Sequence, residues 1–333
     1  MKEKLYGIVA LTVFCICGFF PAVVQAAPFK VLVVMSYEET YPWTMEIKEG
    51  IDSALDKESC EIKYFYMDTK VNFKGGEQKA KEAFALYEAF QPDGVIVADD
   101  NVQSMFILPY LKDKVKTPVM FCGVNAEPEK YGYPASNVSG ILERHPIDES
   151  IALVRQLVPS VRTIGYIVKE SPSAKGILSQ IQKESDTYPV KSGGFRMPKT
   201  LREAVAMTEE LRKECDTLFM VALQGIHDEN GKPLTEKEVI PIVAKTFGKP
   251  TISGDAYSVK YGMLCGVIPR GQEQGGTAAK MLLKAMQGTP VSQIPITRNK
   301  HGKSVINVTV MRALGIKPDP IVLHSAELVT TEK

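Results

Sequence analysis

Short apolar runs rich in β-branched residues alternate with longer amphipathic stretches from Phe29 onward. Residues 29–35 (FKVLVVM) predict a strand buried on both faces, and residues 44–55 predict the helix that follows it. Four such strand–helix units precede residue 125, and the pattern restarts after residue 140. This alternation is typical of βαβ units in a parallel sheet. The sequence therefore predicts an α/β fold with two doubly wound parallel-sheet lobes, joined by several short crossings.

The restart of the pattern divides the chain into two lobes. We expect residues 27–140 together with about 263–290 to form the N-terminal lobe, because the last strand and helix patterns return to it. Residues 141–262 together with about 291–333 are expected to form the C-terminal lobe. Several crossings between two lobes imply a cleft with a hinge beside it, which is a common place for a small-molecule site.

The first 26 residues have the pattern of a targeting segment. Lys2 and Lys4 precede an apolar run, and Val24-Gln25-Ala26 offers small residues for cleavage. We therefore predict a secretory signal peptide over residues 1–26 and a periplasmic location. A retained membrane anchor is the alternative, because the apolar run approaches the length that spans a bilayer.

Composition excludes two broad classes of protein. With 44% hydrophobic and 24% charged residues, the chain has too much apolar content to be mostly disordered. A formal net charge of +1 provides no electrostatic basis for binding nucleic acid. Cys122 and Cys265 lie inside apolar runs, so they are expected to be small buried hydrophobes, although a disulfide is possible in an oxidising compartment.

Signatures of catalysis, metal binding and nucleotide binding are missing from the sequence. The four histidines are scattered, without a pair at the spacing that holds a metal ion on one helical face. Residues 302–304 (GKS) resemble the end of a phosphate-binding loop, but Thr297 stands where its first glycine should be. We expect no cofactor, no metal and no enzyme activity. An enzyme that uses Asp99, Asp100 or Asp255 as acid or base is the rival from another class.

Polar and aromatic residues gather after the predicted strands, where open α/β sheets bind their ligands. The first loop contains the only tryptophan of the chain, which either stacks on a ligand or packs the loop onto the core. Later turns offer oxygens and amides for a zwitterion, although helix capping explains part of them. Asp255 is our choice for binding an ammonium group. The candidate ligand-binding residues are Ser36, Tyr41, Trp43, Asp99, Asp100, Asn101, Asn125, Ser171, Ser173, Gln224 and Asp255.

Three stretches carry a resemblance to a known family: residues 118–128 (PVMFCGVNAEP), residues 137–141 (NVSGI) and residues 306–316, which end in ALGI. Their order and spacing resemble the substrate-binding proteins of ABC transporters with the type I periplasmic-binding fold. The similar branch includes tryptophan- and phenylalanine-binding members. Residues 41–44 (YPWT) additionally resemble the periplasmic sensing modules of some histidine kinases.

This resemblance implies two lobes that close on a small molecule, usually an amino acid, and deliver it to a membrane permease. It also implies a protein that is a monomer when free. The candidate residues other than Gln224 fall where family members contact ligand, but residues 41–43 depart from the smaller polar residues that amino-acid binders tend to have there. We therefore expect a secreted amino-acid-binding protein of an ABC transporter. A sensory receptor that acts with a separate histidine kinase or chemoreceptor is the alternative.

Overall fold

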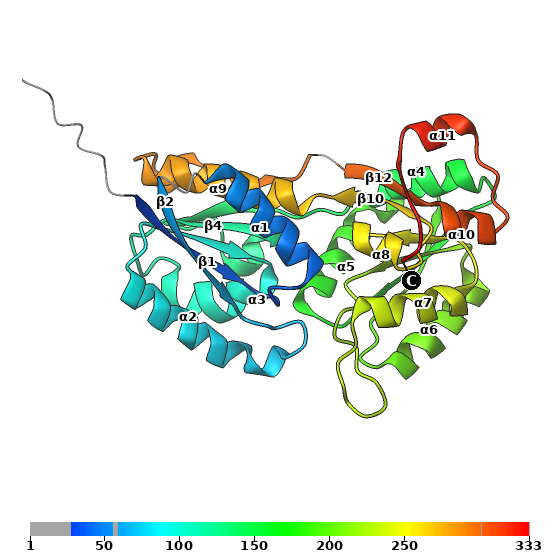
Figure 1. The fold of residues 1–333 in the computed structure, drawn as a ribbon, viewed down its shortest axis with the longest axis horizontal. Helices are drawn as coiled ribbons and strands as arrows, with labels where there is room; N and C mark the ends of the chain where they lie inside the picture. Colours follow the sequence, from blue (N-terminus) through cyan, green and yellow to red (C-terminus); the bar gives the residue numbers. More distant parts are fainter. Residues whose placement is uncertain (1–27, 56–58, 301, 333) are drawn as a thin grey trace, which may run out of the picture.

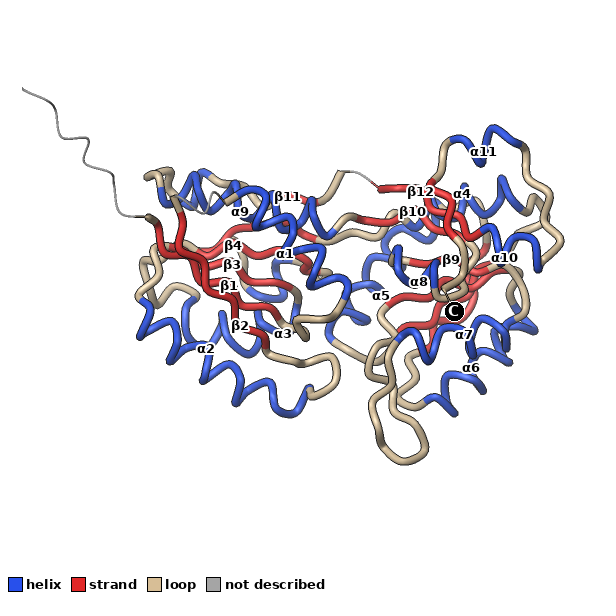
Figure 2. The backbone as a smooth tube through the Cα atoms, in the orientation of Figure 1, coloured by secondary structure: helices blue, strands red, loops and turns tan. Residues whose placement is uncertain are grey.

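The computed structural model describes residues 28–55, 59–300 and 302–332, so the expected signal peptide lies outside the described residues. Two α/β lobes lie side by side (Figure 1), and each has a sheet between helices (Figure 2). The expected α/β fold with two doubly wound lobes is confirmed. Among the described residues, no helix combines the length and the apolar character that crossing a bilayer requires.

The first sheet has the strand order β11-β5-β4-β3-β1-β2, and all its neighbouring strands are parallel. Its strands are β1 (Phe29–Met35), β2 (Cys60–Tyr66), β3 (Gly94–Ala98), β4 (Val119–Val124), β5 (Val138–Leu142) and β11 (Thr297–Arg298). The helices around it are α1 (Pro42–Ala54), α2 (Gly76–Phe90), α3 (Asp100–Val102), which continues as wide π-helical turns over Gln103–Leu111, and α9 (Gly271–Met286).

The second sheet has the order β13-β12-β10-β9-β8-β6-β7 and is parallel except between β10 and β12. Its strands are β6 (Thr163–Val168), β7 (Lys191–Arg196), β8 (Thr217–Val221), β9 (Thr251–Ser253), β10 (Cys265–Pro269), β12 (Gly302–Asn307) and β13 (Glu327–Val329). Its helices are α4 (Ile147–Leu157), α5 (Pro172–Glu184), α6 (Leu201–Glu214), α7 (Glu236–Phe247), α8 (Ala256–Lys260), α10 (Val308–Ala313) and α11 (Pro320–His324).

Both sheets are buried on their two faces. Residues 31–35 of β1 have no exposed surface, which explains the unbroken apolar run. On one face of the first sheet, α1 and α9 pack against β1 and β3, and on the other α2 and the turns after α3 do so. Cys122 in β4 and Cys265 in β10 are fully buried thiols and not disulfide partners.

The α1–α9 pair is packed with its backbones in contact. A Cβ atom on Gly275 of α9 would lie 2.0 Å from the carbonyl oxygen of Ile47, and one on Gly50 of α1 would lie 2.3 Å from that of Gln272. Only glycine allows so close an approach at these positions. α1 is therefore fixed against α9.

The lobe boundaries differ from our expectation at two strands. β10 was expected in the N-terminal lobe, but it lies in the second sheet, where it pairs with β9 and β12. Of the segment 263–290, α9 returns to the first lobe as expected. β11 was expected in the C-terminal lobe, but it extends the first sheet beside β5. Pairing with strands that are distant in the sequence decides which sheet β10 and β11 join. The apolar pattern of a strand does not show which strand it will pair with.

The chain passes between the sheets after β5, after β10 and again after β11. Two of these crossings are joined through Arg144 and Asn299. The amide N–H of Arg144 donates to Asn299 Oδ1 at 2.8 Å, and Asn299 Nδ2 donates to the Arg144 carbonyl oxygen at 3.0 Å. These paired crossings form the hinge between the lobes.

Candidate ligand-binding site

The loop between β1 and α1 and the first turn of α1 bring three aromatic side chains to the cleft between the lobes. Tyr41 precedes α1, whose first residue is Pro42, and the fixed φ of proline suits that position. Tyr37, Tyr41 and Trp43 are each at most 6% exposed. The rings of Tyr37 and Tyr41 meet edge to face with centroids 5.6 Å apart, and Tyr257 from the second lobe meets Tyr41 at 5.9 Å.

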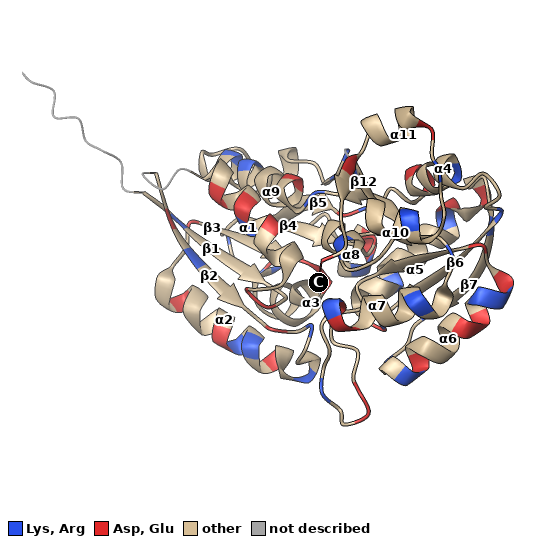
Figure 3. Cartoon of the chain, turned by 45° about the vertical axis from the view of Figure 1, so that its right-hand side comes forward, with Lys and Arg blue, Asp and Glu red and all other residues tan. Residues whose placement is uncertain are grey.

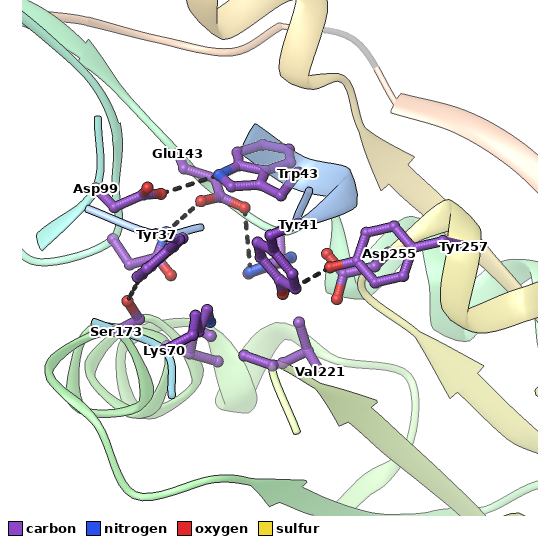
Figure 4. A pocket seen from close by; sticks show the side chains of 14 residues that line it. Tyr37, Tyr41, Trp43, Lys70, Asp99, Glu143, Ser173, Val221, Asp255 and Tyr257 are labelled. Atoms are coloured by element: carbon purple, nitrogen blue, oxygen red, sulfur yellow. Dashed lines mark hydrogen bonds and ion pairs between the residues drawn. The ribbon is translucent and has the colours of Figure 1, made fainter. Parts of the chain in front are cut away.

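These rings enclose a chamber lined by residues of both lobes (Figure 4). Its volume is about 30 Å³, which admits one or two water molecules. The structure therefore represents the closed arrangement of the lobes. An amino acid enters such a chamber only when the lobes separate or the lining side chains move.

Hydrogen bonds between the aromatic loop and the second lobe hold this closed arrangement. The hydroxyl groups of Tyr37 and Ser173 lie 3.0 Å apart, and those of Tyr41 and Tyr257 lie 2.8 Å apart. The Tyr41 hydroxyl also lies within 3.3 Å of Glu236 Oε2, which it reaches as a donor. Each contact joins residues more than 130 positions apart in the chain, so opening of the lobes breaks them together.

Three carboxyl groups face the chamber. Asp99 Oδ1 accepts a hydrogen bond from Trp43 Nε1 at 2.9 Å, and Glu143 Oε2 accepts one from Asn125 Nδ2 at 2.6 Å. Asp255 is 7% exposed, and its buried Oδ2 has no hydrogen-bond partner. A buried acceptor without a partner is costly unless a ligand supplies a donor.

Burial shifts the protonation of these groups. It raises the pKa of Asp99 to about 8, against the opposing charge of Lys70. It also raises the pKa of Asp255 to about 8, with the charge of Glu236 adding to the effect. The pKa of Glu143 rises by burial as well, whereas burial lowers the pKa of His145 to about 4. In the closed chamber Asp99 and Asp255 therefore hold their protons near neutral pH.

Lys70 brings a positive charge to the chamber from the loop after β2. Its side chain is mostly buried, at 8% exposure for the residue. The ammonium group lies 4.3 Å from the centroid of the Tyr37 ring and 5.1 Å from that of Tyr41. This is a cation–π arrangement. The chamber thus combines aromatic faces, an ammonium group and carboxyl groups between the two lobes.

The structure brings six of the predicted site residues to the chamber lining: Tyr41, Trp43, Asp99, Asn125, Ser173 and Asp255. The other five lie elsewhere. Asn101 and Ser171 line a second, larger cavity beside the chamber. Ser36 Oγ donates to the Ala98 carbonyl oxygen at 2.6 Å and so ties β1 to β3.

Asp100 and Gln224 hold neighbouring loops in place. Asp100 Oδ1 accepts hydrogen bonds from the Tyr131 hydroxyl at 2.7 Å and from the Ala126 amide at 3.2 Å. Gln224 Oε1 accepts one from the amide of Glu236, at the start of α7, at 2.9 Å. Both side chains therefore support the loops that carry chamber residues.

The candidate list from the sequence lacked eight other residues that line the chamber: Tyr37, Lys70, Glu143, His145, Ile177, Val221, Ala222 and Tyr257. Lys70 follows the second strand, so the rule that ligands bind at the carboxyl ends of strands would have included it. Glu143 and His145 come directly after β5, on the first crossing between the lobes. A polar residue on such a crossing lies at the base of the cleft. The predicted hinge beside the cleft could therefore have pointed to these two residues.

Two lobes that close over a chamber lined from both sides define a bilobal solute-binding protein. Among the described residues, no cluster of His, Cys, Asp and Glu is arranged to hold a metal ion. Residues 30–330 match the family model of the ABC transporter substrate binding proteins, and the chain belongs to that family. The family consists of solute-binding proteins and not of enzymes, as we expected. Its members are generally extracytoplasmic.

Solved structures share the fold over nearly the whole chain. An ABC domain in complex with L-Trp from Streptococcus pneumonia has a TM-score of 0.71 at 19% identity, covering 91% of this chain and 100% of that one. A ligand-free, open structure of a substrate binding protein with adhesive properties from Clostridium difficile has a TM-score of 0.68 at 17% identity, with the same coverage. The fold is that of the type I periplasmic-binding proteins.

A sequence relative is the tyrosine-binding protein of Clostridioides difficile (strain R20291). It is 26% identical over 222 residues, which are 63% of this chain and 58% of the relative. The match thus spans less than two thirds of the relative's length.

Proposed function

We propose that this protein is a secreted receptor that binds an amino acid with an aromatic side chain in the chamber and delivers it to an ABC transporter permease. The observation that carries the proposal is the lining of the chamber, where four aromatic rings surround one ammonium group and three carboxyl groups. A zwitterion with an aromatic side chain has a partner for each of its parts in this set.

Each partner has a distinct role in the proposed complex. Asp255, whose Oδ2 is buried without a partner, accepts a hydrogen bond from the α-ammonium group. Lys70 pairs with the α-carboxylate, because Lys70 is the lysine among the described residues that line the chamber. Tyr37, Tyr41 and Trp43 stack on the side chain of the ligand.

Two relatives support an aromatic amino acid as the ligand. The relative from Clostridioides difficile is named for tyrosine binding, and the structure from Streptococcus pneumonia was solved with L-Trp. The Tyr41-Pro42-Trp43 segment, which departs from smaller polar loops, enlarges the aromatic surface of the chamber.

Binding is tested by calorimetric titration of the purified protein with L-tryptophan, L-tyrosine, L-phenylalanine and L-leucine. We expect saturable binding of at least one aromatic ligand. At a ligand concentration 100 times the dissociation constant, the stability against unfolding should rise by about 2.7 kcal/mol. Asp255→Asn should abolish both the binding and the rise in stability. Asp148→Asn, at an exposed position in α4, should leave both unchanged. The absence of binding by all four amino acids would refute the ligand class.

Secretion, a monomeric state and delivery to a permease are further parts of the proposal. Mass spectrometry of protein recovered from the cell envelope should find a chain that begins after Ala26. Uptake of the radiolabelled ligand should be lost when the gene is deleted. Normal uptake together with a lost transcriptional or chemotactic response would instead support the sensory alternative, which uses the same chamber.

A further inference from the structure

A second cavity lies beside the chamber and is lined by residues of both lobes. It has a volume of about 860 Å³, and we call it the vestibule. The volume lies within the range of small-molecule sites. Tyr37, Lys70 and Ala222 line both the vestibule and the chamber, so these three residues form the partition between them. The vestibule is therefore a separate space large enough for an organic molecule.

The walls of the vestibule carry an excess of positive charge from both lobes. The first lobe contributes three lysines and the second lobe contributes three more. They are Lys70, Lys74 and Lys130 from the first lobe, and Lys169, Lys175 and Lys199 from the second. Over the helices of both lobes, by contrast, basic and acidic residues are interspersed (Figure 3). The excess of lysines is therefore a local feature of the vestibule.

Few negative groups balance these lysines. Glu170 is the carboxylate in the vestibule lining, and it pairs with Lys199 at 3.0 Å. Lys169 Nζ donates to the carbonyl oxygen of Lys70 at 2.8 Å. Within the described parts of the chain, the ammonium groups of Lys74 and Lys175 form no ion pair, and both residues are exposed. The closed arrangement thus brings six lysines of the two lobes to one cavity, whose lining contains a single carboxylate among the described residues.

Lys169 is affected both by burial and by its charged neighbours. Burial is the main reason that its pKa falls to about 8; the charge of Lys70 adds to this shift, and the charges of Glu38 and Glu236 oppose it. An anion between the lobes would relieve this repulsion. It would also receive neutral hydrogen bonds from the polar side chains of Asn72 and Ser171, while Phe73 offers an apolar face.

We propose that the vestibule binds a small organic or inorganic polyanion, which lysines of both lobes hold at once. Two features favour a small molecule over a macromolecule: the site is concave, and the chain as a whole is nearly neutral. Lysine ammonium groups bind phosphate and carboxylate oxygens by charge-assisted hydrogen bonds. The proposal does not depend on which ligand the chamber binds.

The test uses tripolyphosphate and citrate as probes in calorimetric titrations at constant ionic strength, without divalent cations. Constant ionic strength matters because exposed charges are screened by salt. We expect saturable binding of one or both probes. Lys74→Gln on the first lobe and Lys175→Gln on the second should each weaken it about fivefold.

Matched control variants remove a lysine from each lobe away from the vestibule. Lys280→Gln in α9 and Lys245→Gln in α7 change the net charge equally and lie at exposed positions. They should leave the affinity unchanged. Equal weakening by the controls, weakening by variants of only one lobe, or no saturable binding of either probe would overturn the proposal. Comparison of the two probes tells a phosphate ligand from a carboxylate ligand.

Discussion

The hydrogen bond between Tyr37 and Ser173 provides a test of how the lobes close. The two hydroxyl oxygens lie 3.0 Å apart, on opposite lobes, and both side chains are buried. Tyr37→Phe removes one hydroxyl and deprives the other of this partner in the closed state, whereas water satisfies it in the open state. We expect the variant to disfavour closure by about 1–2 kcal/mol, which lowers the ratio of closed to open molecules about fivefold or more.

The assay is single-molecule energy transfer between dyes on the two lobes. Lys81 in α2 and Lys213 in α6 are exposed and suit replacement by cysteine for labelling. The populations of open and closed molecules are counted with and without L-tryptophan. Adding Ser173→Ala to Tyr37→Phe removes the hydroxyl that lost its partner. The double variant should therefore be less damaging than the sum of the single variants, by about 1 kcal/mol.

A matched pair within one lobe provides the control. The hydroxyl groups of Tyr166 and Ser192 lie 2.8 Å apart, and both residues belong to the second sheet. Tyr166→Phe removes the same kind of hydrogen bond and should leave the populations unchanged. Strictly additive effects of Tyr37→Phe and Ser173→Ala, or an equal effect of Tyr166→Phe, would refute the role of the Tyr37 contact in closure.

Three further predictions follow from the chamber and the core. Lys70→Met should weaken calorimetric binding of L-tryptophan at least about tenfold but not that of tryptamine, which has no carboxylate; equal losses would contradict the assigned role. Asp99 and Asp255 bind protons in the folded state at pH values where the unfolded chain has released them. The free energy of unfolding should therefore fall as the pH rises from about 4 to about 8. Urea titrations should detect this fall, and Asp99→Asn should reduce it; an unchanged slope would argue against the buried acid. Cys122 should resist alkylation until denaturant is added, as followed by mass spectrometry, because it is fully buried and burial raises its pKa.

Local sequence patterns were sufficient for the two α/β lobes and for part of the chamber, but not for the sheet that each late strand joins. The apolar run of β1 and the aromatic residues after it, Tyr41 and Trp43, lie where the strand–helix alternation predicts. β10 shows the limit, because a short apolar strand has the same pattern whichever sheet it joins. Its partners are set by contacts with distant segments.

The charged residues of the chamber show a second limit. A lysine after a strand is usually solvated, and nothing near Lys70 in the sequence reveals the rings of Tyr37 and Tyr41 around its ammonium group. The position of Glu143 depends on the path of the chain between the lobes, which becomes evident only once both sheets are assembled. Residues in contact across a cleft are thus the hardest to identify from a single sequence.

The close packing of α1 on α9 has a consequence for how such a receptor diversifies. α1 begins at the aromatic loop, and the absence of space around Gly275 keeps it from sliding or tilting on its neighbour. The loop is therefore presented from a rigid platform. A lineage built on this platform would acquire a new ligand by exchanging side chains such as Tyr41 or Trp43, one substitution at a time, while the backbone beneath them is inherited unchanged.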